Sequence, residues 1–337
     1  MGWREMESDK TYNLAVIMSS YNGEKYIEEQ IESILNQKTD YNVSLKVLVR
    51  DDGSTDNTIK VINSISTKDK RVMLVDNQGK NLGVKGSFFS LLKNVDDYDM
   101  VFFSDQDDVW APEKIDSFMS TALEKDFFSK AKPMGIYSDA WIADAQAKPT
   151  AEKMSTKYSW MKDDNRYQFL TFNYRIVGAT YAINKTAVRL ANEIPTDWIP
   201  LINMHDSFIG LLISIYGENI IINRPLIYYR QHGNNLVGAG ANNKGLVKKY
   251  NQAVMSIRQL VSDNILVADF VEKRGPWTLD REEYKRRRKF LNRYLLLKTR
   301  DIADRRNLVR NIKPFLWNRH RLFSLIMLYT LSFDVEG

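Results

Sequence analysis

The strongest chemical signal in the sequence is a run of acidic side chains. Asp105-Gln106-Asp107-Asp108 places three carboxylates within four residues. Carboxylates this close repel one another unless a cation or solvent compensates their charge. Hard divalent cations such as Mg²⁺ prefer oxygen ligands, often one or two carboxylates together with substrate phosphates. A solvated acidic loop is the alternative, but apolar residues on both sides favour acids that are held against a core.

Two further polar clusters each follow a short apolar run. Ser20-Tyr21-Asn22-Gly23-Glu24 comes after the first run, and Asp51-Asp52-Gly53-Ser54 comes after the second. Either cluster alone could be an ordinary turn or helix cap. If the apolar runs are parallel strands, however, all three polar clusters meet at the carboxyl edge of one sheet, where ligands bind.

The elements that would position these clusters alternate in type. Strands are predicted at Leu14–Ser19, Leu45–Arg50, Val72–Val75 and Met100–Ser104. Amphipathic helices are predicted at Glu24–Asn36, Thr55–Ile65 and Val84–Lys93, and after Pro112. This alternation predicts an α/β fold with a mostly parallel sheet and right-handed crossovers.

The middle of the chain is less regular, and the last quarter is helical. Strands are predicted at Met134–Ser138, Ala179–Ile183, Ile220–Asn223 and Leu226–Tyr229, a loop at Asp197–Asn203 and a helix at His205–Tyr216. A Gly/Asn-rich breaker covers Gly233 to Gly245. We therefore expect a catalytic domain over residues 12–240 and a helical C-terminal region over 245–337.

Composition narrows the class of protein. The 337 residues are 44% hydrophobic and 12% aromatic, which is typical of a folded globular chain. Cysteine is absent, which excludes disulfides and thiolate metal sites. The N-terminal residues lack the apolar stretch of a secretory signal, and the longest apolar run, Leu322–Leu331, is too short to span a membrane. A cytoplasmic location is expected.

Charge is distributed unevenly along the chain. Residues 244–337 carry 21 Lys/Arg against 10 Asp/Glu, whereas the preceding residues carry 27 against 32. Arg286–Lys289 and Trp317–Phe323 place basic residues beside apolar and aromatic ones, as in helices that lie on anionic membranes. A hairpin packed on the catalytic domain or on a partner subunit is an equal alternative. We find no nucleic-acid-binding motif.

The order of the motifs resembles family 2 glycosyltransferases with the GT-A fold, a Rossmann-like sheet flanked by helices. The resemblance covers Asn13 to Asn235 and rests on Ser19–Gly23, Asp51–Asp56, Asn81–Gly83 and Ser104–Trp110. The Ser104–Trp110 motif includes the family's Asp-x-Asp (DXD) pattern. Its particular form, with His205-Asp206 and Tyr229–His232, looks like the rhamnosyltransferase branch that builds Gram-positive cell-wall polysaccharides.

The resemblance implies a role for each candidate residue on the nucleotide side. Tyr21 would stack on the nucleobase and Asp51 would accept from its imide N–H, with Glu24 and Asp52 in support. Asp105 would hold the ribose or deoxyribose. Lys85 and Arg230 are further candidate contacts to the nucleotide or its phosphates.

The resemblance also implies a metal site and a catalytic base. Asp107 would bind a divalent ion, Mg²⁺ or Mn²⁺, on the diphosphate, and His232 would approach that ion. Asp206 would take the proton from the acceptor hydroxyl, because inverting transfer by direct displacement needs a base. Gly178 would let the backbone approach the sugar or acceptor, or would simply start a strand. Many family members have Glu where this chain has His205, so the role of His205 stays open.

The expected activity is inverting transfer of L-rhamnose from dTDP-L-rhamnose to a lipid-linked saccharide at the inner face of the cell membrane. Transfer from a UDP-hexose into a capsule or teichoic-type polymer is an alternative. So is a non-catalytic membrane- or partner-binding protein on the same fold, and the apolar tail permits a homodimer. A nucleotidyltransferase is disfavoured because Tyr21-Asn22-Gly23 stands where a Gly-rich, Arg-containing loop is expected.

Overall fold

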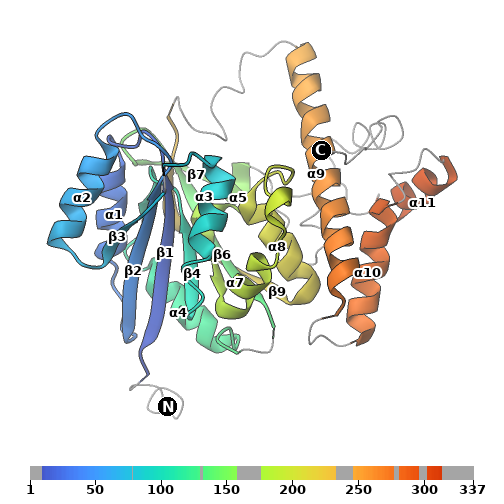
Figure 1. Cartoon of the computed structure of the whole chain (residues 1–337), viewed down its shortest axis with the longest axis horizontal. Coiled ribbons are helices and arrows are strands. Elements are labelled where there is room, and N and C mark those ends of the chain that lie inside the picture. Colours follow the sequence, from blue (N-terminus) through green and yellow to red (C-terminus); the bar gives the residue numbers. More distant parts are fainter. Residues whose placement is uncertain are drawn as a thin grey trace.

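The computed structural model describes residues 10–77, 79–129, 132–157, 176–232, 246–276, 281–295 and 302–312. They form a curled central sheet with helices on both faces (Figure 1). The strand order is β3-β2-β1-β4-β8-β6-β9-β5, and β7 pairs with β6. The architecture is therefore the mixed α/β fold that the sequence predicts.

The first four strands are all parallel. They are β1 (Tyr12–Ser20), β2 (Val43–Asp51), β3 (Val72–Val75) and β4 (Met100–Ser104). The helices that follow them are α1 (Ile27–Leu35), α2 (Thr58–Lys68), α3 (Gly83–Leu92) and α4 (Lys114–Glu124). The predicted βα alternation is confirmed, and β3 and β4 have the predicted bounds.

The second half of the sheet is mixed. Its strands are β5 (Val109–Trp110), β6 (Met134–Ala143), β7 (Pro149–Lys153), β8 (Tyr181–Asn184) and β9 (Glu218–Arg230). Strand β8 runs antiparallel to both β4 and β6, whereas β9 runs parallel to β6. The prediction of two short strands between Ile220 and Tyr229 is wrong. They are one strand, and the Pro225 between them is accommodated by a register shift against β6.

Short elements complete this half. They are α5 (Met154–Lys157), α7 (Lys185–Asn192), α8 (His205–Tyr216) and the 3₁₀ turns Gly178–Thr180 and Thr196–Trp198. Helix α8 has the predicted bounds. Helix α7 is absent from the sequence prediction; the Asn184 side chain caps it by accepting from the Ala187 N–H.

Two apolar cores cover the two faces of the sheet. Along β1, Leu14 and Val16 belong to the core beneath α1, α2 and α4, whereas Ala15 and Ile17 belong to the core beneath α3, α7 and α8. Successive strand residues point to opposite faces, so a strand covered on both sides is apolar throughout. Helical cover on both faces leaves the strand ends free to carry the polar clusters.

The C-terminal region packs onto the second of these cores. Helices α9 (Leu246–Arg274) and α10 (Arg281–Leu295) lie side by side next to α8, and α11 (Ile302–Ile312) follows (Figure 1). Val261, Ile265 and Val271 of α9 are fully buried in the cluster that contains the apolar face of α8. The helical prediction is confirmed over the described part of this region.

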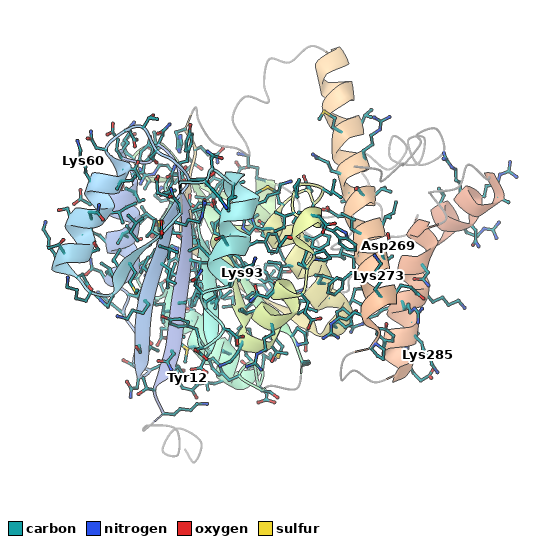
Figure 2. All side chains as sticks on the ribbon, in the orientation of Figure 1. Tyr12, Lys60, Lys93, Asp269, Lys273 and Lys285 are labelled. Atoms are coloured by element: carbon teal, nitrogen blue, oxygen red, sulfur yellow. The ribbon has the colours of Figure 1, made fainter. Side chains whose placement is uncertain are left out.

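Some basic residues of the C-terminal region have partners inside the protein. Arg287 donates to the carbonyls of Ser214 and Gly217 at the C-terminal end of α8, at 2.7 and 3.0 Å, and Arg288 pairs with Glu272 of α9. By contrast, Lys285 lies on the outer side of α10 (Figure 2). The packed-hairpin alternative therefore accounts for part of the basic charge. The predicted interfacial stretch Trp317–Phe323 and the breaker Gly233–Gly245 lie outside the described residues.

Within the described ranges, none of the helices combines the length and the apolar character that crossing a bilayer requires.

Candidate active site

The three polar clusters meet at the carboxyl edge of the parallel strands. The Ser20 hydroxyl at the end of β1 donates to Asp51 Oδ1 at 3.0 Å. Gln106 Oε1 accepts from the Tyr21 N–H at 2.9 Å, and Gln106 Nε2 donates to the Tyr21 carbonyl at 3.0 Å. A Cβ at Gly23 would lie 2.2 Å from Gln106 Oε1, so a larger residue there would displace the Gln106 side chain from Tyr21. The sequence prediction that these segments share one site is confirmed.

The Asp51 carboxylate builds the turn that follows β2. Besides the Ser20 hydroxyl, it accepts from the N–H of Gly53 at 3.0 Å and from the N–H and hydroxyl of Ser54. Two donors reach each oxygen, which uses the four lone-pair positions of a carboxylate. A nucleobase imide could bind Asp51 only by displacing one of these donors, so its contact with the base stays a prediction.

Asp52 joins the same turn to the start of α3. Its carboxylate accepts from the N–H groups of Leu82 and Gly83, at 2.7 and 2.8 Å, at the positive end of that helix. Arg50, buried at 1% exposure, pairs with it at 2.5 Å and also donates to the Ser87 hydroxyl. Gly83 has φ +67°, which favours glycine. The Asn81–Gly83 motif is thus the partner of Asp52.

Tyr21 and Glu24 occupy the rim of this edge. The Tyr21 side chain is 52% exposed, so its ring is open to stacking as predicted. Glu24 Oε2 accepts from the backbone and side-chain nitrogens of Asn57, at 2.8 and 2.9 Å. Glu24 therefore fixes the turn before α2, and its support of a nucleoside pocket stays a prediction.

The carboxyl groups that follow β4 repel one another, and burial adds to the cost of their charges. Burial, followed by the charges of Asp107 and Asp206, raises the pKa of Asp105 to about 7. Burial also raises the pKa of Asp108 well above its usual value, and Asp108 Oδ1 accepts from the Arg230 N–H at 3.0 Å. The partial exposure of Asp107 leaves it accessible to a ligand. An added cation would relieve the repulsion among these groups.

Asp107 and His232 form the candidate metal pair. Asp107 Oδ2 lies 2.8 Å from His232 Nε2, and the His232 ring packs 4.8 Å from that of Tyr26. Among the described residues, no three His, Cys, Asp or Glu side chains lie together so that they could hold a metal ion. Two protein ligands fit an ion that takes its other ligands from water and a bound diphosphate, as Mg²⁺ commonly does. The donor set thus suits the predicted ion.

Arg230 differs from its predicted role as a nucleotide or phosphate contact. Its side chain is 2% exposed and donates to the carbonyls of Asp107 and Ala145, at 2.6 and 2.7 Å. It also pairs with Glu29 at 2.5 Å and lies 4.6 Å from the ring centroid of Tyr26. Arg230 therefore braces the loop that carries Asp107, rather than presenting its charge at the surface of the site.

Lys114 is a buried cation that the sequence analysis did not single out. Its ammonium donates to the Ala179 carbonyl at 2.9 Å and lies 3.6 Å from the ring centroid of Trp110. Burial lowers its pKa well below the usual value, while Asp108 and Asp105 oppose this shift. A lysine at the first position of an amphipathic helix gives no sequence signal of such a role.

Asp206 lies in the first turn of α8 and is 8% exposed. Its Oδ2 accepts from the Gly178 N–H at 2.6 Å. A Cβ at Gly178 would lie 3.4 Å from that oxygen and 3.2 Å from His205 Nε2. The structure thus brings the Gly178 backbone beside the predicted base, and its approach to the sugar or acceptor stays a prediction.

His205, the residue before Asp206, is buried as an uncharged ring against Phe88. It stacks on Phe88 at a centroid distance of 3.9 Å, and neither ring nitrogen has a hydrogen-bond partner among the described residues. Burial lowers the pKa of His205 to about 4, although Asp206 opposes the shift. Its neutral form is therefore the one present near neutral pH.

Lys85 has different partners from those expected. Its ammonium donates to the carbonyls of Pro200 and Ile202, at 2.9 and 2.5 Å, in the segment that precedes α8. It therefore connects α3 to the segment that leads to Asp206.

Comparison with known proteins gives a consistent family. The glycosyl transferase family 2 model matches residues 15–183. A dTDP-rhamnosyl transferase of Shigella flexneri, RfbG, is 32% identical, over 74% of this chain and 86% of that protein. A UDP-Glc:α-D-GlcNAc-diphosphoundecaprenol β-1,3-glucosyltransferase of Escherichia coli, WfgD, is 33% identical, over 34% of this chain and 42% of that protein.

Solved structures show the same fold. Staphylococcus aureus TarS (residues 1–349) in complex with UDP-GlcNAc aligns with a TM-score of 0.55 and 14% identity, over 94% of this chain and 89% of that one. The mannosyltransferase PcManGT of Pyrobaculum calidifontis, in complex with GDP-Man and Mn²⁺, gives a TM-score of 0.51 and 14% identity, over 96% and 86%. The chain belongs to glycosyl transferase family 2 and is a glycosyltransferase with the GT-A fold.

Proposed function

We propose that this glycosyltransferase moves L-rhamnose from dTDP-L-rhamnose, with inversion and with the help of a divalent cation, to a hydroxyl of a lipid-linked polysaccharide precursor. The observation that carries the proposal is the proximity of both Asp107 and Asp206 to Asp105. Burial is the main reason that the pKa of Asp105 is raised to about 7, and the charges of Asp107 and Asp206 add to this shift. This proximity supports a single site for the candidate base and the candidate metal ligand Asp107.

The chain's own groups can perform a single displacement. Asp206 takes the proton of the acceptor hydroxyl while that oxygen attacks the anomeric carbon, and the bond from this carbon to the diphosphate breaks. The Gly178 N–H donates to Asp206 Oδ2 and the Ser207 N–H donates to Oδ1, each at 2.6 Å, so both oxygens are held in place and each keeps a lone pair that can accept the proton. A divalent cation bound by Asp107 and His232 would supply charge neutralisation for the leaving diphosphate.

The donor sugar is inferred from similarity together with the nucleotide side of the site. The Shigella flexneri relative, which matches 74% of this chain at 32% identity, is named as a dTDP-rhamnosyl transferase. The exposed ring of Tyr21 offers a stacking surface for a pyrimidine base. A UDP-hexose donor is the competing candidate, since the Escherichia coli relative is named for UDP-Glc.

The acceptor and the location are inferred from the name of one relative and from the exposed charge of α10. The Escherichia coli relative is named for an acceptor on diphosphoundecaprenol, a lipid carrier. The exposed basic residues of α10, Lys285, Arg286 and Lys289, would attract an anionic membrane surface. We therefore place the enzyme at the cytoplasmic face of the cell membrane as a peripheral protein. Flotation with liposomes tests this: binding that does not depend on anionic lipid would contradict it.

A donor panel tests the activity. The full chain would be incubated with dTDP-L-rhamnose, UDP-glucose, UDP-GlcNAc and GDP-mannose, each with Mg²⁺, with Mn²⁺ or with EDTA, and release of the nucleoside diphosphate would be measured. We expect turnover with dTDP-L-rhamnose that EDTA abolishes. Turnover only with a UDP-sugar would overturn the rhamnose assignment, and undiminished turnover in EDTA would overturn the metal assignment.

A further inference from the structure

The segment that leads to Asp206 is contacted by side chains that are distant from it in the sequence. Between the 3₁₀ turn Thr196–Trp198 and the start of α8 at His205, the backbone has no regular structure. The N–H groups of Leu201 and Ile202 bond to the Trp198 carbonyl, and side chains pair other polar groups of the segment. Those side chains come from α3 and from the C-terminal helix α9.

Lys85 of α3 reaches this segment from the nucleotide side. Its ammonium donates to two carbonyls, those of Pro200 and Ile202, at 2.9 and 2.5 Å. Burial lowers the pKa of Lys85, and the charge of Asp263 opposes that shift. Lys85 lies three residues after Leu82, whose N–H binds Asp52, so the same helix start serves both the nucleotide-side turn and this segment.

Asp263 of α9 reaches the same segment from the opposite side. Its side chain is 3% exposed, and Oδ1 accepts from the Asn203 N–H at 2.8 Å. Burial is the main reason that the pKa of Asp263 is raised to about 7; the Asn203 N–H and Lys85 lower it, and Asp206 raises it further. Asp263 is therefore close enough to Asp206 for the two carboxyl groups to interact electrostatically.

Helix α9 makes two more contacts that hold the segment. The Lys273 ammonium, on the α9 surface shown in Figure 2, lies 5.3 Å from the ring centroid of Trp198. Ile202 is 1% exposed and belongs to the same apolar core as Val261 and Ile265 of α9. Helix α9 thus reaches Trp198 and Asn203 with charged side chains, and its apolar face belongs to the same core as Ile202.

We propose that Asp263 and Lys85 are positioning residues that fix the 200–203 backbone and thereby the place of Asp206 against the acceptor. This makes the C-terminal helix α9 part of the wall of the active site. The catalytic part of the inference rests on the proposed function. A base displaced by a fraction of the distance between reacting atoms loses much of its effect, because proximity and orientation account for a large share of catalysis.

Substitutions at Asp263 test the proposal. Asp263→Leu removes the acceptor for the Asn203 N–H, whereas Asp263→Asn keeps an oxygen at that place. We expect the leucine variant to lower kcat at least about tenfold with donor KM unchanged, and the asparagine variant to stay within about threefold of wild type. Asp269→Leu on the same helix (Figure 2) is the matched control and should leave kcat unchanged.

A second pair of variants keeps the test decisive if Asp263→Leu does not fold. Lys85→Met should lower kcat in the same way, with Lys93→Met, at the end of the same helix, as its control. Hydrogen–deuterium exchange of the peptide that spans residues 199–206 should be faster in Lys85→Met and Asp263→Leu than in wild type. Wild-type exchange and kcat within about twofold of wild type in a folded variant would overturn the proposal.

Exchange needs no donor or acceptor, so it separates this inference from the proposed function. If wild type turned over no donor, the proposed function would fail, while the exchange rates would still decide whether Asp263 and Lys85 hold the segment.

Discussion

The nucleotide side and the acceptor side of this site are built in different ways. On the nucleotide side, Asp51 binds the N–H groups of Gly53 and Ser54, two and three residues further on, and its longer contact with Ser20 joins the ends of two adjacent parallel strands. On the acceptor side, the Gly178 N–H reaches Asp206 across 28 positions, and Asn203 reaches Asp263 across 60. The first side can be built by compact motifs after parallel strands. The second depends on packing among β8, α8 and α9, so distant substitutions should act mainly there.

The largest expected effect lies on the acceptor side. Asp206→Asn removes the proposed base while keeping an oxygen to accept from Gly178, so we expect kcat to fall on the order of 10³-fold. Binding of dTDP should stay within about twofold of wild type, since the substitution removes none of the hydrogen bonds on the nucleotide side. Calorimetric titration with dTDP and steady-state kinetics would measure the two quantities. Wild-type kcat in this variant would refute the assignment of the base.

The next effect lies on the nucleotide side. Asp107→Asn weakens one of the two proposed metal ligands, so we expect kcat/KM to fall on the order of 10²-fold and the Mg²⁺ concentration for half-maximal rate to rise. The highly exposed Asp97 supplies the control Asp97→Asn, which should change neither quantity. An unchanged metal requirement in Asp107→Asn would place the ion elsewhere.

His205 gives the acceptor side a pH-dependent stability. Its pKa falls from 6.5 to about 4 on folding because the ring is buried. A depressed pKa contributes stability that is present above pH 6.5 and is lost as the pH falls toward 4. In that window wild type should lose up to about 3 kcal/mol of unfolding free energy that His205→Phe retains. Urea unfolding of both proteins at pH 7.5 and 4.5 measures the difference, and parallel losses would contradict it.

The smallest effect concerns the attachment of the C-terminal helices. Arg287 caps the C-terminal end of α8 by donating to the Ser214 and Gly217 carbonyls. Arg287→Met should therefore lower the unfolding free energy by about 1–2 kcal/mol. The exposed Lys289 on the same helix provides the control Lys289→Met. If both variants melted alike, the cap would contribute nothing measurable.

The contrast between the two sides also explains what the sequence could predict. Strands β3 and β4 and helix α8 have the predicted bounds, because short apolar runs and helical periodicity are local signals. The convergence of the polar clusters followed from a parallel sheet alone. Strand β7, Pro149–Lys153, was missed because it is largely exposed and has no apolar alternation.

The buried charged side chains could not be predicted. Lys114 and Arg50 are recognised only when their partners, the Ala179 carbonyl and the Asp52 carboxylate, are in place. Asp263 follows the base by 57 positions, and an aspartate in a long amphipathic helix gives no sign of its contact with Asn203. Such contacts depend on tertiary packing, which local sequence patterns do not encode.

The stereochemistry of transfer tests the central claim most directly. The wild-type chain would hydrolyse dTDP-L-rhamnose with Mg²⁺, and proton NMR would follow the first rhamnose released, before its anomers equilibrate. A single displacement assisted by Asp206 predicts that this sugar has the anomeric configuration opposite to that of the donor. Release of rhamnose with the donor's own configuration would contradict the account.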